Sequence, residues 1–135
     1  AGYSSLDMHT DSALQTDDKV EWTAGATYAM GAFTMGYQFS VEDEKSTTID
    51  YYENSAFGVS FNVNDNLTLS YNNYKSDKTN VGSADVELEA SSIQLAYTMG
   101  GMSIRVADGE VDNATYSTTA VNQKDGRVVS VSLAF

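Results

Sequence analysis

The sequence contains no cysteine and no proline. Without cysteine, the chain can form neither a disulfide framework nor a thiolate metal site. Basic residues are also scarce, because seven Lys and Arg stand against nineteen Asp and Glu and give a formal charge of −12. Binding of nucleic acid through its phosphates needs a basic surface, so this class of partner is excluded. A surface of this charge attracts cations instead.

Long apolar runs and catalytic motifs are missing as well. No apolar run approaches the roughly 18 residues of a transmembrane helix, and no segment repeats apolar residues with helical spacing. The only histidine is His9, and the chain has neither a Gly-Xaa-Ser-Xaa-Gly elbow nor an HExxH motif. We therefore expect no enzyme. The length of 135 residues indicates a single domain or barrel segment over 1–135.

The most regular feature is an alternation of apolar and polar residues with a period of two. In "GAFTMGYQFSVE" (31–42), large apolar side chains occupy every second position from Phe33 to Val41. This alternation is typical of a strand with one apolar and one polar face. The same pattern predicts strands over 19–30, 33–41, 57–63, 67–71, 93–99, 102–107 and 127–135, and more weakly within 1–10.

The connections between these strands alternate in length. Short turns are expected at 31–32, 64–66 and 100–101, whereas long acidic connections are expected at 10–18, 42–50, 76–85 and 108–126. All short turns then lie at one end of the sheet and all long loops at the other. Transmembrane barrels have this asymmetry.

The apolar face carries too many aromatic rings to fill a small lumen, so we expect it to point outward into lipid. Aromatic residues near the short turns, Tyr28, Phe33, Tyr97 and Phe135, fit an interfacial girdle. The predicted fold is an all-β, transmembrane, antiparallel up-and-down β-barrel with about eight strands in this chain. A soluble β-sandwich that binds a partner is the competing class, and it would bury the same face in protein.

Three stretches carry a resemblance to a known family. The end of the chain, "RVVSVSLAF" (127–135), resembles the C-terminal signature strand of Gram-negative outer-membrane proteins. The segments "ATYAMGAFTMGYQFS" (26–40) and "IQLAYTMGGMSIRVA" (93–107) resemble strand–turn–strand hairpins of general porins, particularly those of alphaproteobacteria. From about Lys19 onward, the chain is similar to the C-terminal half of such a porin.

The resemblance implies a sixteen-stranded barrel in the outer membrane, a homotrimer, and passive diffusion of small hydrophilic solutes and ions. It also implies contacts with lipid and lipopolysaccharide, and an inward-folded loop in the other half of the barrel. Only about eight strands are present here. We expect a segment of a longer porin; the alternative is a complete, closed eight-stranded barrel with a structural, adhesive or binding role in its acidic loops. The net charge predicts cation preference.

Several charged or polar residues are candidates for the pore wall. Arg105 is the one charge in the middle of a predicted strand, and it is either a pore-lining cation or the partner of a loop carboxylate. Lys19, Glu21 and Glu42 are expected on the polar face near the long-loop mouth, and Gln38 is expected in the wall.

The acidic stretch "DGEVDN" (108–113) is a weak calcium candidate, with Asp108, Glu110 and Asp112 at alternate positions. It lacks the Gly and distal Glu of an EF-hand loop, so divalent ions bridging an acidic loop to lipopolysaccharide are the alternative.

The alternation of apolar and polar residues has one irregularity, between Val86, Leu88 and Ile93, where the apolar pattern changes phase. We expect a bulge there, or the point at which the strand leaves the membrane.

Overall fold

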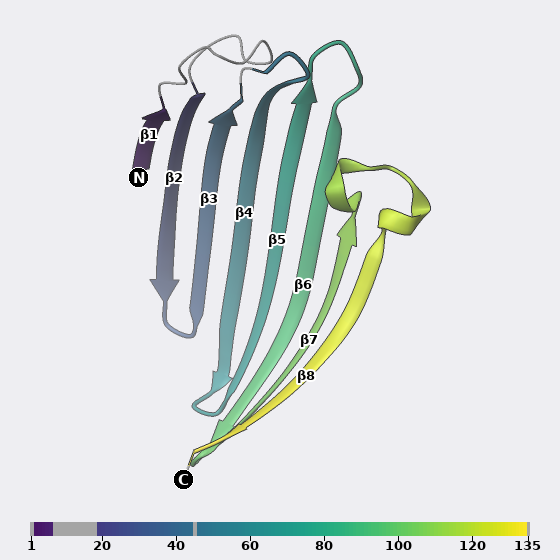
Figure 1. The fold of residues 1–135 in the computed structure, drawn as a ribbon. Helices are drawn as coiled ribbons and strands as arrows, with labels where there is room; N and C mark the ends of the chain where they lie inside the picture. Colours follow the sequence, from purple (N-terminus) through teal and green to yellow (C-terminus); the bar gives the residue numbers. More distant parts are fainter. Residues whose placement is uncertain (1, 7–18, 45, 135) are drawn as a thin grey trace.

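In the computed structural model, which describes residues 2–6, 19–44 and 46–134, every strand pairs antiparallel with its neighbours along the chain. The strands form one up-and-down sheet in the order β1 to β8 (Figure 1). The all-β, antiparallel part of the predicted fold class is confirmed. The strands are β1 (Gly2–Leu6), β2 (Lys19–Met30), β3 (Phe33–Asp43), β4 (Ile49–Asn64), β5 (Leu67–Asn80), β6 (Val86–Met99), β7 (Met102–Asp112) and β8 (Lys124–Leu133).

Short turns close the lower end of the sheet in Figure 1, at residues 31–32, 65–66 and 100–101. The first and last match the predicted turns, and the second is one residue shorter than the predicted 64–66. Gly31 and Gly100 open two of these turns with φ of 59°. Side chains with a Cβ rarely adopt this left-handed conformation, so glycine is suited to both positions. The long connections share the opposite end, and the predicted segment 10–18 lies outside the described residues.

The long connections are shorter than the sequence predicts. They cover residues 44–48, 81–85 and 113–123, whereas the alternation of hydrophobicity suggested loops over 42–50, 76–85 and 108–126. The prediction was wrong at these strand ends because pairing continues where apolar residues stop. Backbone hydrogen bonds of a ladder do not depend on side-chain polarity, so polar segments stay extended when their neighbours are extended.

The expected bulge in β6 is absent. The β5–β6 ladder runs in unbroken register from Lys78↔Val86 to Leu67↔Tyr97. The apolar residues simply change face: Val86 and Leu88 lie on one face and Ile93 lies on the other. Register shifts occur instead in the β4–β5 ladder, near the two ends of β4.

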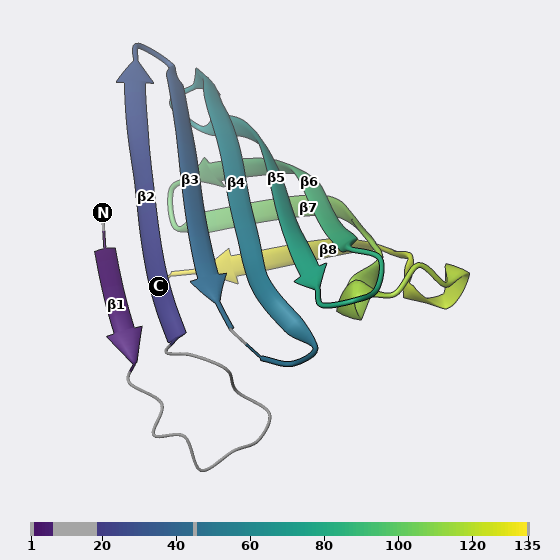
Figure 2. The ribbon, with the colours of Figure 1, turned by 90° about the horizontal axis from the view of Figure 1, so that it is seen from above.

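The sheet is curved and open at both edges (Figure 2). No ladder joins β1 to β8 among the described residues, so closure into a barrel is not part of the fold seen here. The remaining regular elements are two single-turn 3₁₀ helices, η1 (Ala114–Tyr116) and η2 (Ala120–Asn122). No helix in the described part of the chain is long and apolar enough to cross a membrane.

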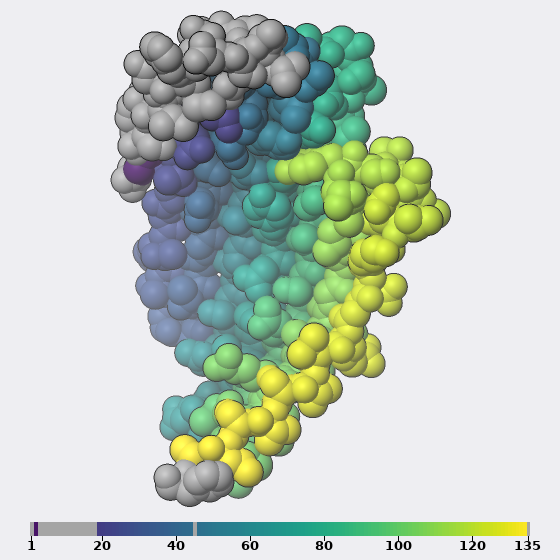
Figure 3. Space-filling model, viewed as in Figure 1, coloured from purple at the N-terminus to yellow at the C-terminus, as the bar shows by residue number. Residues whose placement is uncertain are grey.

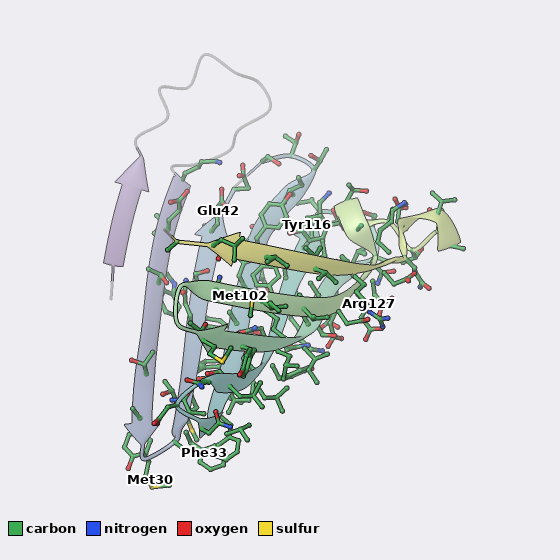
Figure 4. All side chains as sticks on the ribbon, turned by 90° about the horizontal axis from the view of Figure 1, so that it is seen from below. Met30, Phe33, Glu42, Met102, Tyr116 and Arg127 are labelled. Carbon is green, nitrogen blue, oxygen red and sulfur yellow. The ribbon has the colours of Figure 1, made fainter. Side chains whose placement is uncertain are left out.

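The two faces of the sheet differ sharply. On the face that we call the apolar face, large side chains form a continuous band that starts at the short-turn end, and no described apolar residue is buried. Tyr28 is 60% exposed and Tyr37 is 53% exposed. Figure 4 shows Met30 and Phe33 at the short-turn end of this band. Its large exposed members are Trp22, Tyr28, Met30, Phe33, Met35, Tyr37, Phe57, Leu69, Tyr71, Ile93, Leu95, Met99, Val129, Val131 and Leu133.

Candidate functional site

The opposite face, the polar face, holds a hollow of about 750 Å³ that extends across β2 to β7. The residues that strand alternation directs into it are small, carry amides or hydroxyls, or are aliphatic, and none of them is charged. They are Gly25, Thr27, Gly36, Gln38, Ala56, Gly58, Asn72, Tyr74, Ala90, Ser92, Gly109 and Val111. Such a surface offers hydrogen bonds to water and to polar solutes.

Glycines allow neighbouring strands to crowd on the polar face. A Cβ added to Gly109 would lie 3.1 Å from the backbone oxygen of Ser91, and one added to Gly25 would lie 3.1 Å from the backbone oxygen of Tyr37. These approaches are tighter than ordinary van der Waals contacts, and the atoms approached are backbone atoms. The absence of side chains at these positions therefore lets the sheet curve toward its polar face.

Lys19, Glu21 and Glu42 meet at the long-loop end of the polar face, as predicted. Glu21 is opposite Glu42 in the β2–β3 ladder. The Nζ of Lys19 lies 3.6 Å from the Oε1 of Glu42 and also contacts Glu44. Figure 4 shows Glu42 at the opposite end of β3 from Phe33.

The proximity of these groups shifts two pKa values. Burial, followed by the hydrogen bond and repulsion from Glu44, raises the pKa of Glu42 above that of an ordinary glutamate. The hydrogen bond with Glu44 raises the pKa of Lys19, so this ammonium group stays charged. The cluster is therefore acidic overall, and the Glu42 carboxyl gains a proton at a higher pH than an ordinary glutamate does.

Gln38 and Arg105 also lie on the polar face, at other heights. Gln38 lines the hollow, with its Nε2 3.4 Å from the Oγ1 of Thr23. Arg105 lies nearer the short turns, opposite Ala96 and Ser130 in the two flanking ladders. Its side chain is exposed, and no described residue supplies a carboxylate within ion-pair distance. The loop-carboxylate partner of the second hypothesis is therefore absent among the described residues.

The calcium candidate is not assembled. Asp108, Glu110 and Asp112 lie on strand β7, where alternate side chains are roughly 6.7 Å apart along one face, too far to enclose an ion. Asp108 pairs with Arg127, and Glu110 accepts a hydrogen bond from Ser91. The described residues contain no group of three or more potential ligands that could hold a metal. The loop interpretation was wrong because β7 continues to Asp112.

These carboxylates belong to a charged collar on the apolar face, above the apolar band. Alternation along the paired strands places the members of the collar on the same face, and Lys75 bridges Glu87 and Glu89 at 3.3 and 3.2 Å. Much of the negative charge therefore lies on the face opposite the hollow. The collar comprises Glu53, Lys75, Asp77, Glu87, Glu89, Asp108, Glu110, Asp112, Asp125 and Arg127.

Sequence reasoning missed a cluster around Tyr116 on the polar face. The Tyr116 hydroxyl lies 2.7 Å from the Oγ of Ser76, which also donates to the Oδ1 of Asn54. The Tyr116 ring packs 5.4 Å from the Tyr52 ring, and the Lys78 ammonium lies 5.8 Å above it. Ser76 is the one described residue that is fully buried.

The backbone of this segment is strained. Asn113, Thr115 and Tyr116 have φ of 52°, 62° and 55°. For a β-branched or bulky residue, such a conformation costs roughly 1–3 kcal/mol, and it persists only where surrounding contacts impose it. The Tyr116 contacts supply that compensation. The sequence "DNATYS" gives no signal of it, since no glycine marks the turn.

No protein-family model matches the chain, and neither curated proteins nor solved structures give a match. The functional interpretation therefore depends on the faces of the sheet and on the residues that they carry.

Proposed function

We propose that the chain forms the wall of an outer-membrane porin, a water-filled channel for passive diffusion of small hydrophilic solutes and ions. One observation carries the proposal: an uncovered apolar band lies directly behind a neutral polar hollow. A soluble sheet covers its apolar face with protein. A membrane barrel exposes that face to lipid and keeps its polar face toward water.

The dimensions of the band support this proposal. On β3 the band runs from Phe33 to Val41, which is roughly 26 Å along a strand that rises about 3.3 Å per residue. A strand tilt of about 40° reduces this to roughly 20 Å, close to the ~25 Å apolar band of outer-membrane barrels. The charged collar begins where the band ends, as expected at the level of lipid headgroups.

The two open edges of the sheet must be paired if the protein lies in a membrane, so we propose a closed barrel as the functional state. Backbone groups of an unpaired edge strand cannot be satisfied in hydrocarbon, so a sheet in lipid must close. The interior of an eight-stranded barrel is filled by side chains. The polar face here carries small residues and a hollow, which favours a wider barrel completed by further strands. The trimer follows from the porin resemblance and is part of the same proposal.

The preference of the channel for cations is proposed on local rather than total charge. On the β2–β3 side of the long-loop mouth, Glu21, Glu42 and Glu44 outnumber Lys19. Lys78 and Lys124 add positive charge to the polar face farther along the sheet, and the collar carboxylates lie on the lipid side. Only charges that face the lumen act strongly on a passing ion. We therefore expect a modest cation preference, smaller than a net charge of −12 would suggest.

The test is single-channel recording of the detergent-folded protein in a planar bilayer with a salt gradient. Stepwise conductance with a cation-selective reversal potential supports the channel. A folded, heat-modifiable protein that inserts without conductance contradicts it, and points to a closed barrel that acts through its outer loops. A protein that is monodisperse without detergent contradicts membrane insertion itself.

A further inference from the structure

We propose that the 113–123 connection is the size-limiting element at the long-loop end of the lumen, held there by Tyr116. This inference rests on the proposed channel and adds a specificity-determining residue to it. The connection joins β7 to β8, yet its contacts are with strands farther along the sheet. Figure 3 shows the connection standing out over the neighbouring strands.

Its path crosses the polar face. The Nδ2 of Asn113 donates to the backbone oxygen of Glu87 on β6, at 2.8 Å. Three residues later, the Tyr116 hydroxyl reaches Ser76 on β5, and its ring reaches Tyr52 on β4. A connection that merely extended above β7 and β8 would touch neither β4 nor β5. The segment therefore moves inward, over the space that solutes would use.

The anchor is built from four side chains of the polar face. Tyr52, Asn54, Ser76 and Lys78 occupy alternate polar-face positions on two paired strands, with Tyr52 opposite Lys78 and Asn54 opposite Ser76. Together they give Tyr116 a hydroxyl partner, an aromatic partner and a cation over its ring. Burial of Ser76 shows that the contact excludes water.

The rest of the connection is internally tied. The backbone nitrogen of Asn122 donates to the oxygen of Thr119 at 2.9 Å, and the Asn122 side chain donates to the Thr119 hydroxyl at 2.7 Å. The segment is therefore a folded body that is fixed to the sheet at Asn113 and Tyr116. Release of Tyr116 would swing this body away and widen the mouth, because the left-handed backbone at 115–116 depends on the anchor.

A thiol-accessibility experiment tests the anchor without relying on channel activity. The chain has no native cysteine, so Ser76→Cys introduces one thiol beneath Tyr116. In detergent-folded protein, we expect a charged methanethiosulfonate reagent to label Cys at 76 slowly. Adding Tyr116→Ala should raise the rate about tenfold or more by opening the site, and Tyr116→Phe should raise it less. Ser70→Cys, on the same face of β5 but nearer the short turn, is the matched control and should label rapidly in all backgrounds.

Solute exclusion tests the functional part. In planar bilayers, Tyr116→Ala should raise single-channel conductance and admit larger polyethylene glycols than the parent, with Arg127→Gln on the apolar face as an unchanged control. If Tyr116→Ala fails to fold, a chain with residues 113–123 replaced by an Asn-Gly turn should give the same widening. Channels whose size cut-off is unchanged in both variants overturn the inference and leave the porin proposal standing. Absence of any channel overturns the porin proposal, while rapid labelling of Cys at 76 in the parent overturns the anchor.

Discussion

Arg127 on β8 lies directly opposite Asp108 on β7 and donates a hydrogen bond to it, with 2.7 Å between Nε and Oδ2. One step nearer the short turns on the same face, the facing residues are Val106 and Val129. The ion pair therefore marks the boundary between the charged collar and the apolar band. Both side chains are largely exposed, so the pair itself adds only a few tenths of a kcal/mol to stability. The position of this pair shows how far the apolar band extends along β7 and β8.

The depth of the band predicts where a charge is tolerated. Leu95 lies in the middle of the band, between Leu69 and Val106. We expect Leu95→Lys to lower the free energy of unfolding in lipid vesicles by about 2–4 kcal/mol, because the ammonium would face hydrocarbon. Fluorescence of Trp22, the single tryptophan, reports unfolding by urea.

Ser91→Lys is the control for Leu95→Lys. Ser91 lies on the same strand and face but beside Glu110 in the collar, so the new charge is expected to change stability by less than about 0.5 kcal/mol. Equal losses for the two variants would contradict a lipid-facing band.

Arg105 is expected to oppose cation entry from the lumen side. Arg105→Gln should shift the reversal potential in a salt gradient toward stronger cation selectivity, because it removes a positive charge from the polar face. Arg127→Gln makes the same change on the apolar face and should leave the potential unaltered. Identical shifts for both variants would mean that Arg105 does not line the channel.

The raised pKa of Glu42 predicts a pH-dependent selectivity. As the pH falls from about 8 to about 4, Glu42 gains its proton earlier than an ordinary glutamate, because burial and Glu44 disfavour its charged form. Cation preference should therefore start to decline at a higher pH than it would if Glu42 were an ordinary glutamate. Glu42→Gln should weaken the preference at high pH and flatten this decline, as measured by reversal potentials.

Glu53→Gln is the matched control for Glu42→Gln. Glu53 sits near the same height but on the apolar face, opposite Val41. Its removal should leave the pH profile of selectivity intact, and a profile altered equally by both substitutions would show that the mouth cluster is not responsible.

Gly101 is expected to set the position of the C-terminal end of β8. A Cβ at Gly101 would lie 2.5 Å from the backbone oxygen of Ala134, whose nitrogen donates to the Gly101 oxygen. Gly101→Ala should therefore displace this end and cost about 1–3 kcal/mol, seen as a lower unfolding midpoint of the folded band on a gel. Gly126→Ala has open space around its Cβ and should have little effect. If Gly101→Ala leaves the unfolding midpoint unchanged, the end of β8 can move without cost and Gly101 does not set its position.

Much of the fold was predictable because its main signal is local. Alternation along 19–30 and 33–41 defined two faces, and Gly31 and Gly100 marked turns that the structure confirms. The polar-face placement of Lys19, Glu21, Gln38, Glu42 and Arg105 followed from the same period of two.

The site was predicted less well, because its remaining parts depend on pairing between distant residues. The sequence predicts a loop at Asp108, Glu110 and Asp112. In the structure, pairing of β7 with β6 and β8 keeps this segment extended. Nothing near Tyr116 in the sequence points to Ser76, which is 40 residues away. Contacts between residues so far apart in the sequence depend on which strands the fold places next to each other. Local periodicity carries no information about that arrangement.

The sequence by itself determined that this chain forms a two-faced antiparallel sheet with short turns at one end, since residue alternation and turn chemistry act over a few positions. Tertiary structure decided three further features: how far each strand extends beyond its apolar part, which face receives most of the negative charge, and where the last connection lies. Those depend on ladder register and on the Tyr116 contacts, which form only when strands far apart in the chain lie side by side.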